Sequence, residues 1–252
     1  MSTLQGVKCP PDFSLQHSRR STEGSLADYA ESLALEHVQA TDPEQRKAKG
    51  QFFTPKEIAR FMASLFHVKG KNISLLDPGA GAGILTASFC ERLLPLKAKR
   101  ISIDAYENDP SLLPSLKRVL EECKSVLEEV GHQVSINLQE RDFILDNAQF
   151  FDKERSSFWQ TEQPTFGYIV SNPPYYKLNG ASPHARAMKE LELGHPNVYA
   201  FFMALSLQLL NRNGEMVFIV PRSFCSGFYY KKFRSWLLDN ASLAHIHSFE
   251  SR

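Results

Sequence analysis

The chain has 252 residues, of which 42% are hydrophobic and 23% are charged, values typical of a soluble globular protein. No apolar run approaches the roughly 20 residues that cross a bilayer, and residues 1–24 lack the apolar stretch of a secretory signal, so we expect a cytoplasmic protein. The formal net charge of +1 neither indicates nor excludes a polyanionic partner.

The first part of the chain is predicted to be helical after a lead-in. Residues 1–24 are polar and show no periodicity, so we expect a mobile segment without a fold. Ser25 is a suitable N-cap, and residues 26–38 place apolar side chains at helical spacing. A second amphipathic helix is predicted in the sequence PKEIARFMASLF. Residues 25–70 are therefore expected to form an N-terminal helical segment, followed by a sheet core over residues 71–252.

Short, apolar and β-branched runs alternate with helical patterns in the rest of the chain. The predicted strands are residues 73–77, 101–107, 134–143, 166–172, 214–221 and 243–249. Helical patterns such as GILTASFCERLLP and NVYAFFMALSLQLL lie between them. Buried strands that alternate with helices are typical of an α/β fold with a doubly wound, mostly parallel sheet.

The first predicted strand ends in the sequence DPGAGAG. Gly79, Gly81 and Gly83 allow a tight turn whose backbone can approach a ligand, and the helix that follows offers unpaired N–H groups. A tight connection without a ligand uses the same glycines, so this motif alone leaves both interpretations open. The turn lacks the Lys-Ser/Thr ending of a P-loop, which disfavours a phosphate cradle.

Acidic and aromatic residues end the next two predicted strands. Glu107 ends the second strand, where nucleotide-binding α/β folds place an acidic side chain on ribose hydroxyls. Asp142 and Phe143 end the third, where a carboxylate can accept a hydrogen bond from an adenine amino group and a ring can cover the base. Asp77 puts a negative charge where a pyrophosphate would sit, which favours an amine-bearing ligand. S-adenosylmethionine combines an amine and a sulfonium with ribose and adenine, and is the predicted cofactor.

The sequence VSNPPYYKL, residues 170–178, ends the fourth predicted strand with two prolines and two tyrosines. The amino group of adenine is a poor nucleophile because its lone pair is delocalised into the ring, so its methylation requires acceptors for its hydrogens. The side-chain oxygen of Asn172 and the carbonyl of Pro173 are the predicted acceptors. Tyr175 is predicted to stack on a flipped-out base. The structural alternative is a proline-terminated strand followed by a surface turn.

Together, NPPYYKL, DPGAGAG and GQFFTP (residues 50–55) resemble the gamma-type N6-adenine DNA methyltransferases, and among them the Eco57I-like restriction-modification methylases. The resemblance covers residues 25–252 and implies a Rossmann-like methyltransferase domain that acts on double-stranded DNA. It also implies that Thr54 and Phe53 contact the methionine part of the cofactor and that Asn108 lies beside its adenine.

Other functions remain open at this stage. The same Asn-Pro-Pro-Tyr chemistry fits a glutamine amide of a protein or adenine in RNA, and a cofactor-binding remnant that needs a partner subunit is a further class. We see no segment for the antiparallel seventh strand of such sheets and no recognition domain. We therefore expect these residues to methylate DNA weakly and without strong site preference, unless a recognition subunit or a C-terminal recognition domain is supplied.

No metal site is predicted. His245 and His247 alternate on the last predicted strand but have no Cys or carboxylate beside them. The cysteines are too scattered for a disulfide framework or a zinc site, at positions Cys9, Cys90, Cys123 and Cys225. His184 lies in a loop over residues 179–196 that is either a substrate-facing segment or a long connection.

Overall fold

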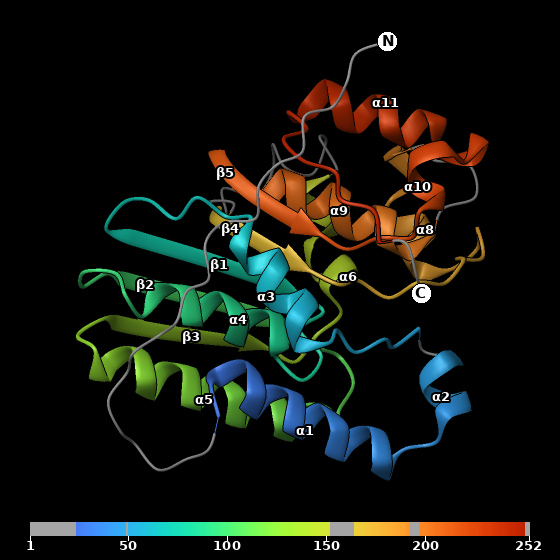
Figure 1. The fold of residues 1–252 in the computed structure, drawn as a ribbon. Coiled ribbons are helices and arrows are strands. Elements are labelled where there is room, and N and C mark those ends of the chain that lie inside the picture. Colours follow the sequence, from blue (N-terminus) through green and yellow to red (C-terminus); the bar gives the residue numbers. More distant parts are fainter. Residues whose placement is uncertain (1–23, 49, 152–163, 192–196, 250–252) are drawn as a thin grey trace.

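The computed structural model describes residues 24–48, 50–151, 164–191 and 197–249 (Figure 1). The lead-in predicted for residues 1–24 lies outside the described residues, except for Gly24. The helices are α1 Leu26–Ala40, α2 Pro43–Ala48, α3 Lys56–Ser64, α4 Ile84–Leu93, α5 Leu113–Glu129, α6 Phe143–Asn147, α8 Pro183–Ala187, α9 Val198–Leu209, α10 Ser223–Ser226 and α11 Lys231–Asn240. The strands are β1 Asn72–Pro78, β2 Arg100–Tyr106, β3 Gln133–Gln139, β4 Phe166–Ser171 and β5 Leu210–Phe218. Among the described residues, no helix is both long and apolar enough to span a membrane.

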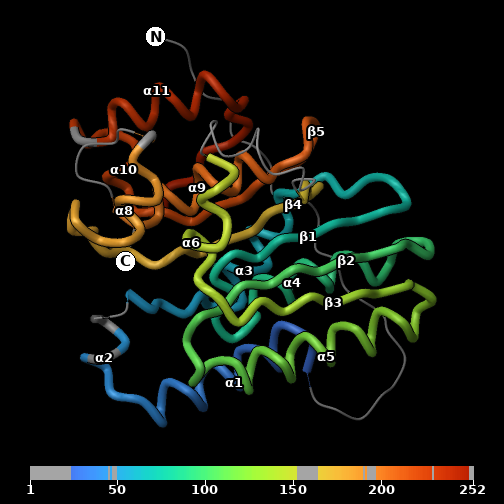
Figure 2. Tube along the Cα trace, turned by 180° about the vertical axis from the view of Figure 1, so that it is seen from behind, coloured from blue at the N-terminus to red at the C-terminus, as the bar shows by residue number. Residues whose placement is uncertain are grey.

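The described strands form one parallel sheet in the order β3-β2-β1-β4-β5, which confirms the predicted doubly wound α/β fold. Figures 1 and 2 show α1 and α5 together beside β3, while α9 and α11 lie at the opposite end of the sheet. The chain winds outward from β1 in both directions, so β1 and β4 are neighbours although they are far apart in sequence. Ligands of open α/β sheets bind at such a switch point, beyond the carboxyl ends of the strands.

Successive side chains of β4 enter two separate cores on the two faces of the sheet. Tyr168 and Val170 belong to the core under α1, α3, α4 and α5, and Ile169 belongs to the core under α6, α9 and α11. All three are buried. This arrangement explains why the predicted strand reads as a continuous apolar run: both of its faces are covered by helices.

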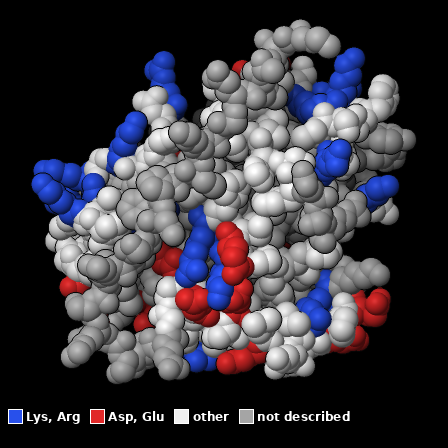
Figure 3. All heavy atoms as spheres, in the orientation of Figure 1, with Lys and Arg blue, Asp and Glu red and all other residues white. Residues whose placement is uncertain are grey.

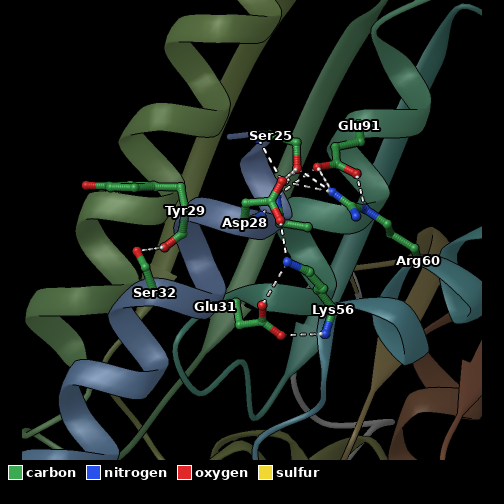
Figure 4. Close-up of polar contacts among 9 residues, drawn as sticks. Ser25, Asp28, Tyr29, Glu31, Ser32, Lys56, Arg60 and Glu91 are labelled. Atoms are coloured by element: carbon green, nitrogen blue, oxygen red, sulfur yellow. Dashed lines mark hydrogen bonds and ion pairs between the residues drawn. The ribbon is translucent and has the colours of Figure 1, made fainter. Parts of the chain in front are cut away.

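Helix α1 begins as predicted, because Ser25 and Asp28 form a reciprocal capping box. Figure 4 shows how this helix start is tied to α3 and α4 by ion pairs. Lys56 lies 2.7 Å from Asp28, and Arg60 contacts Asp28 and lies 3.0 Å from Glu91. The hydrogen bond from Lys56 is the largest of several contacts that hold the pKa of Asp28 well below its usual range. The predicted N-terminal helices therefore pack onto the sheet core as one unit with it.

The structure corrects two predicted strands. Residues 243–249 form no strand; instead, the rings of His247 and Phe249 contact Phe61 of α3, at centroid distances of 4.7 Å and 6.1 Å. A β-branched run becomes a strand only when a sheet edge pairs with it. Here the segment makes side-chain contacts with α3 and does not pair with the sheet. The strand predicted for residues 134–143 ends at Gln139, since Asp142 caps α6 and Phe143 lies inside that helix.

Candidate active site

The carboxyl ends of β1, β2 and β4 open into a cavity of about 550 Å³. This volume is within the usual range of small-molecule sites. The cavity is lined by predicted site residues from five separate parts of the chain, namely Phe53, Gly79, Gly81, Glu107, Asn108, Asp142, Phe143 and Asn172. It is also lined by Gly50, Gln51 and Phe52, which belong to an extended segment, residues 50–54, that we call the strap. The structure therefore brings eight of the predicted site residues to one cavity, whereas the predicted target residues Pro173 and Tyr175 do not line it.

The glycine turn after β1 is held against the end of β2. The N–H groups of Gly79 and Ala80 donate to the Tyr106 carbonyl, at 2.9 Å and 2.8 Å. The N–H of Gly81 donates to the Glu107 side chain at 2.9 Å. Gly81 and Gly83 have φ angles of +59° and +88°, a region that favours glycine. The turn therefore needs its glycines for its backbone shape, as the sequence predicts.

Alanine at Gly83 is expected to reduce the free energy of unfolding by about 2 to 4 kcal/mol, because it combines left-handed strain with overpacking. A Cβ at this position would lie 2.9 Å from Val119 and 3.0 Å from Leu116 on α5. The matched control is Gly81→Ala, since a Cβ there meets nothing within 4 Å. It is expected to cost only about 1 to 2 kcal/mol of strain. Chemical denaturation of both variants checks this, and equal losses would contradict the packing argument.

Glu107 is nearly buried, and each of its carboxylate oxygens accepts a backbone N–H. Oε1 accepts from Asp109 at 2.8 Å and Oε2 accepts from Gly81 at 2.9 Å. Burial raises the pKa of Glu107, although these two hydrogen bonds oppose the shift. The side chain lines the cavity and its oxygens keep further acceptor capacity, so it can bind ligand hydroxyls.

Asp142 caps α6 and also contacts the cavity. Its Oδ1 accepts the Leu145 N–H at 2.9 Å, while its Oδ2 lies 2.9 Å from His184 Nε2 and 3.2 Å from Asn108 Nδ2. Burial alone would raise its pKa, but the hydrogen bonds from His184 and Leu145 outweigh burial and lower the pKa of Asp142. A ligand amino group that binds Oδ2 therefore meets an ionised carboxylate that already has two side-chain partners.

Phe143 forms an apolar wall of the cavity. Its side chain is buried, and its ring lies 5.2 Å from the rings of both Tyr106 and Phe202. Tyr106 and Phe202 also line the cavity. The resulting aromatic surface suits a flat heterocycle.

Asp77 does not line the cavity and is completely buried. Thr86 donates to its Oδ2 at 2.7 Å, whereas Oδ1 has no hydrogen-bond partner among the described residues. Burial raises the pKa of Asp77 to about 7; the Thr86 hydrogen bond opposes this shift and the nearby charge of Glu107 adds to it. A buried carboxylate with a free oxygen fits a cationic ligand group better than an anionic one.

Asn172 follows β4 directly and faces the strap. Its Nδ2 donates to the Phe52 carbonyl at 2.9 Å and to the Thr54 hydroxyl at 3.0 Å. Its Oδ1 accepts a hydrogen bond from the Tyr175 hydroxyl. Thr54 itself is buried and does not line the cavity. Both functional groups of the Asn172 amide are thus engaged by neighbouring residues.

The two other residues of the predicted target site lie beside Asn172. Tyr175 is half-buried, and its ring stacks on the exposed ring of Phe52 at a centroid distance of 5.8 Å. Pro173 is buried, and no N–H or O–H group of the described residues donates to its carbonyl. Neither Pro173 nor Tyr175 lines the cavity, so Asn172 is the only one of the three predicted target residues in its wall.

Three further residues belong to the site although the sequence interpretation gave them no role there: Gln51, Asp109 and His184. Gln51 Nε2 donates to Asp109 Oδ2 at 2.6 Å, which fastens the strap to the segment after β2. His184 reaches Asp142 from α8, inside the loop whose role was open. The GQFFTP motif contains Gln51, but nothing in the sequence indicates its partner. These contacts join segments that are 58 and 42 residues apart.

Comparisons with known proteins concern the family and the fold of the chain. A family model described as Eco57I restriction-modification methylase matches residues 55–252. The chain is 38% identical to Type II methyltransferase M.BsuBI of Bacillus subtilis and 34% identical to Type II methyltransferase M.PstI of Providencia stuartii, over 81% and 84% of its length. It spans 40% of the length of each of these curated relatives.

A comparison with solved structures concerns the fold of the chain. A solved structure from Listeria monocytogenes, assigned as a class I S-adenosylmethionine-dependent methyltransferase, matches 86% of this chain and 60% of its own. The TM-score is 0.60 and the sequence identity is 18%. At this identity the likeness concerns the fold, which is Rossmann-like.

Proposed function

The chain belongs to the Eco57I restriction-modification methylase family, and from this premise we propose that it transfers a methyl group from S-adenosylmethionine to the N6 amino group of adenine in DNA. The observation that carries the proposal is the single cavity that joins the carboxylates of Glu107 and Asp142 to the amide of Asn172. Carboxylates suit a ribose and an amino group, whereas an amide oxygen beside a free carbonyl suits an amine that must be activated.

The cofactor half of the site uses the ends of β1, β2 and the start of α6. Glu107 accepts hydrogen bonds from the ribose hydroxyls, Asp142 accepts one from the adenine amino group, and Phe143 covers the base. Gly79 and Gly81 give the ligand access to the backbone, with Asn108 at the adenine and Phe53 at the methionine part. When bound, S-adenosylmethionine supplies a methyl group on a positively charged sulfur. The unpartnered oxygen of buried Asp77 supports an ammonium group near the glycine turn.

The target half of the site activates a weak nucleophile without a strong base. The adenine amino group donates its two hydrogens to the Asn172 oxygen and the Pro173 carbonyl, which draws the nitrogen lone pair out of conjugation with the ring. This nitrogen attacks the methyl carbon as the bond from that carbon to sulfur breaks. The positive charge that grows on nitrogen is stabilised by the two fixed acceptors, and the extra proton then leaves to water. Tyr175 holds the base by stacking.

Charge distribution supports a nucleic-acid partner beside α11. Arg222, Lys231 and Lys232 are exposed and form no ion pair with any described residue. In Figure 3, basic side chains and no acidic ones are visible along the right-hand edge of the upper half, where α10 and α11 lie in Figure 1. Acidic and basic groups lie against each other lower on that face. Basic side chains free of partners suit the phosphates of double-stranded DNA.

The test measures transfer of a tritiated methyl group to unmethylated genomic DNA, to RNA and to glutamine-containing peptides. The DNA product is digested to nucleosides. We expect label in N6-methyl-2′-deoxyadenosine. Label in RNA or in a glutamine amide would instead show that the same chemistry acts on one of these alternative substrates. Cofactor binding without transfer to any substrate would support a remnant that needs a recognition subunit or a recognition domain.

Cofactor affinity is expected to depend on pH through Asp77, whose pKa is raised to about 7. Below this pH the carboxyl is protonated and uncharged; above it, the buried carboxylate attracts an ammonium group that lies near the glycine turn. Between about pH 5.5 and 7 the ionised fraction rises from about 3% to about 50%, so the Kd for S-adenosylmethionine should fall by up to about 15-fold. Isothermal titration calorimetry checks this, in a range where the ligand amine remains charged.

Two controls isolate the role of Asp77. Methylthioadenosine has the same ribose and adenine but no amine, so its affinity should stay nearly constant over this range. The variant Asp77→Asn should bind S-adenosylmethionine with a flat pH profile. A wild-type profile that is already flat would contradict an attraction between the Asp77 carboxylate and the ligand amine.

A further inference from the structure

The Asn172 amide is held in one orientation by the strap. Nδ2 carries two hydrogens, and both have acceptors: the Phe52 carbonyl at 2.9 Å and the Thr54 hydroxyl at 3.0 Å. A carbonyl oxygen only accepts hydrogen bonds. If the amide turned over, Oδ1 would face the Phe52 carbonyl and two acceptors would repel each other. The strap therefore forces the Asn172 oxygen to face away from it.

The Asn172 oxygen points to the Tyr175 hydroxyl, which has two acceptors within reach. It contacts Asn172 Oδ1, and it lies 2.8 Å from the Ile219 carbonyl. A hydroxyl has one hydrogen, so it donates to one of these at a time. Burial raises the pKa of Tyr175, which keeps this hydrogen in place. When a target amine donates to Oδ1, the hydroxyl can turn to Ile219, and the acceptor becomes available without any movement of the ring.

Thr54 is in a position to act on Asn172 and not on a ligand in the cavity. Its side chain is 7% exposed and does not line the cavity, whereas its neighbour Phe53 does. The other end of the strap is fastened by Gln51, which donates to Asp109 at 2.6 Å. Pro55 caps α3 on the far side of Thr54. The chain is therefore held on both sides of Thr54, by Gln51 before it and by the start of α3 after it.

We propose that Thr54 is a positioning residue for methyl transfer: its hydroxyl, together with the Phe52 carbonyl, holds the Asn172 amide so that its oxygen faces the target amine. This inference rests on the proposed function. It differs from the role that family resemblance implies for Thr54, which is contact with the methionine part of the cofactor. The two roles predict different kinetic defects, because one concerns the rate at saturation and the other concerns cofactor affinity.

The experiment compares Thr54→Val, which keeps the shape of the side chain but removes the hydroxyl, with Thr54→Ser, which keeps the hydroxyl. We expect Thr54→Val to lower the single-turnover rate at saturating S-adenosylmethionine by about tenfold, because the Asn172 amide then keeps only the Phe52 carbonyl as a strap acceptor and is held less firmly with its oxygen toward the target amine. Its Kd for S-adenosylmethionine should stay within about threefold of wild type. Thr54→Ser should recover most of the rate, a rescue that a purely structural role would not produce.

Thermal unfolding accompanies each variant, and Thr54→Ala replaces Thr54→Val if the valine variant does not fold. A large rise in the Kd with an unchanged saturated rate would overturn the inference and return Thr54 to the cofactor site. So would wild-type values of both quantities. An inactive wild-type chain would instead contradict the proposed function itself, so the two failures are distinguishable.

Discussion

Asn172→Ala is expected to lower the rate of methyl transfer by about 100-fold to 1,000-fold, the usual effect of removing one fixed hydrogen-bonding group that stabilises charge in a transition state. The affinity for S-adenosylmethionine should change little, because in the proposed mechanism the amide acts on the target amine and not on the cofactor. Single-turnover transfer at saturating cofactor measures the first quantity, and calorimetry measures the second.

A matched control for this variant is Asn211→Ala. Asn211 is exposed near the start of β5, away from the carboxyl ends of the strands. It should keep the wild-type rate. Because Asn172 also holds the strap through Phe52 and Thr54, the thermal stability of Asn172→Ala should be measured beside its activity. An equal loss of cofactor affinity and rate would contradict the division of the cavity into two halves.

Glu107→Ala is expected to weaken S-adenosylmethionine binding by about 1 to 3 kcal/mol, or roughly fivefold to 150-fold in Kd. The ribose hydroxyls lose a charged acceptor, and the N–H groups of Gly81 and Asp109 lose theirs as well. The glycine turn should therefore loosen when the ligand is absent. Calorimetric titration measures the affinity, and thermal unfolding shows how much of the effect arises in the free protein.

Two further variants separate charge from shape at this position. Glu107→Gln keeps the size of the side chain and one acceptor oxygen, so its affinity should lie between those of wild type and Glu107→Ala. Glu121→Ala removes an exposed carboxylate from α5 and should bind the cofactor normally. Unchanged affinity in Glu107→Ala would show that the ribose does not bind at the end of β2.

Much of the secondary structure follows from local patterns in the sequence. The capping residue Ser25 and the apolar spacing after it define the start of α1. Continuous apolar runs indicate strands covered on both faces, as β1 and β4 are. The strand ends also carry the candidate site, because parallel strands bring their carboxyl ends to one edge of the sheet. Glu107 and Asn172 meet there for that reason.

Predictions were less accurate where a residue's environment is set by distant parts of the chain. Asp77 was expected to face the ligand, but it lies completely buried against Thr86. The run at residues 243–249 has strand propensity, yet it contacts α3 through its aromatic side chains. Propensity describes what a segment can form, whereas pairing and burial depend on which neighbour reaches it.

The sequence by itself determined the α/β class, the glycine turn and the candidate site residues, because these depend on residue type and on periodicities of a few positions. Only the tertiary structure decided that the strap crosses to Asp109 and Asn172, and that His184 reaches Asp142. These contacts join segments between 42 and 120 residues apart, and no local pattern specifies such a partner. They form because the sheet first brings the strand ends together, which leaves polar groups of neighbouring loops within hydrogen-bonding distance of one another.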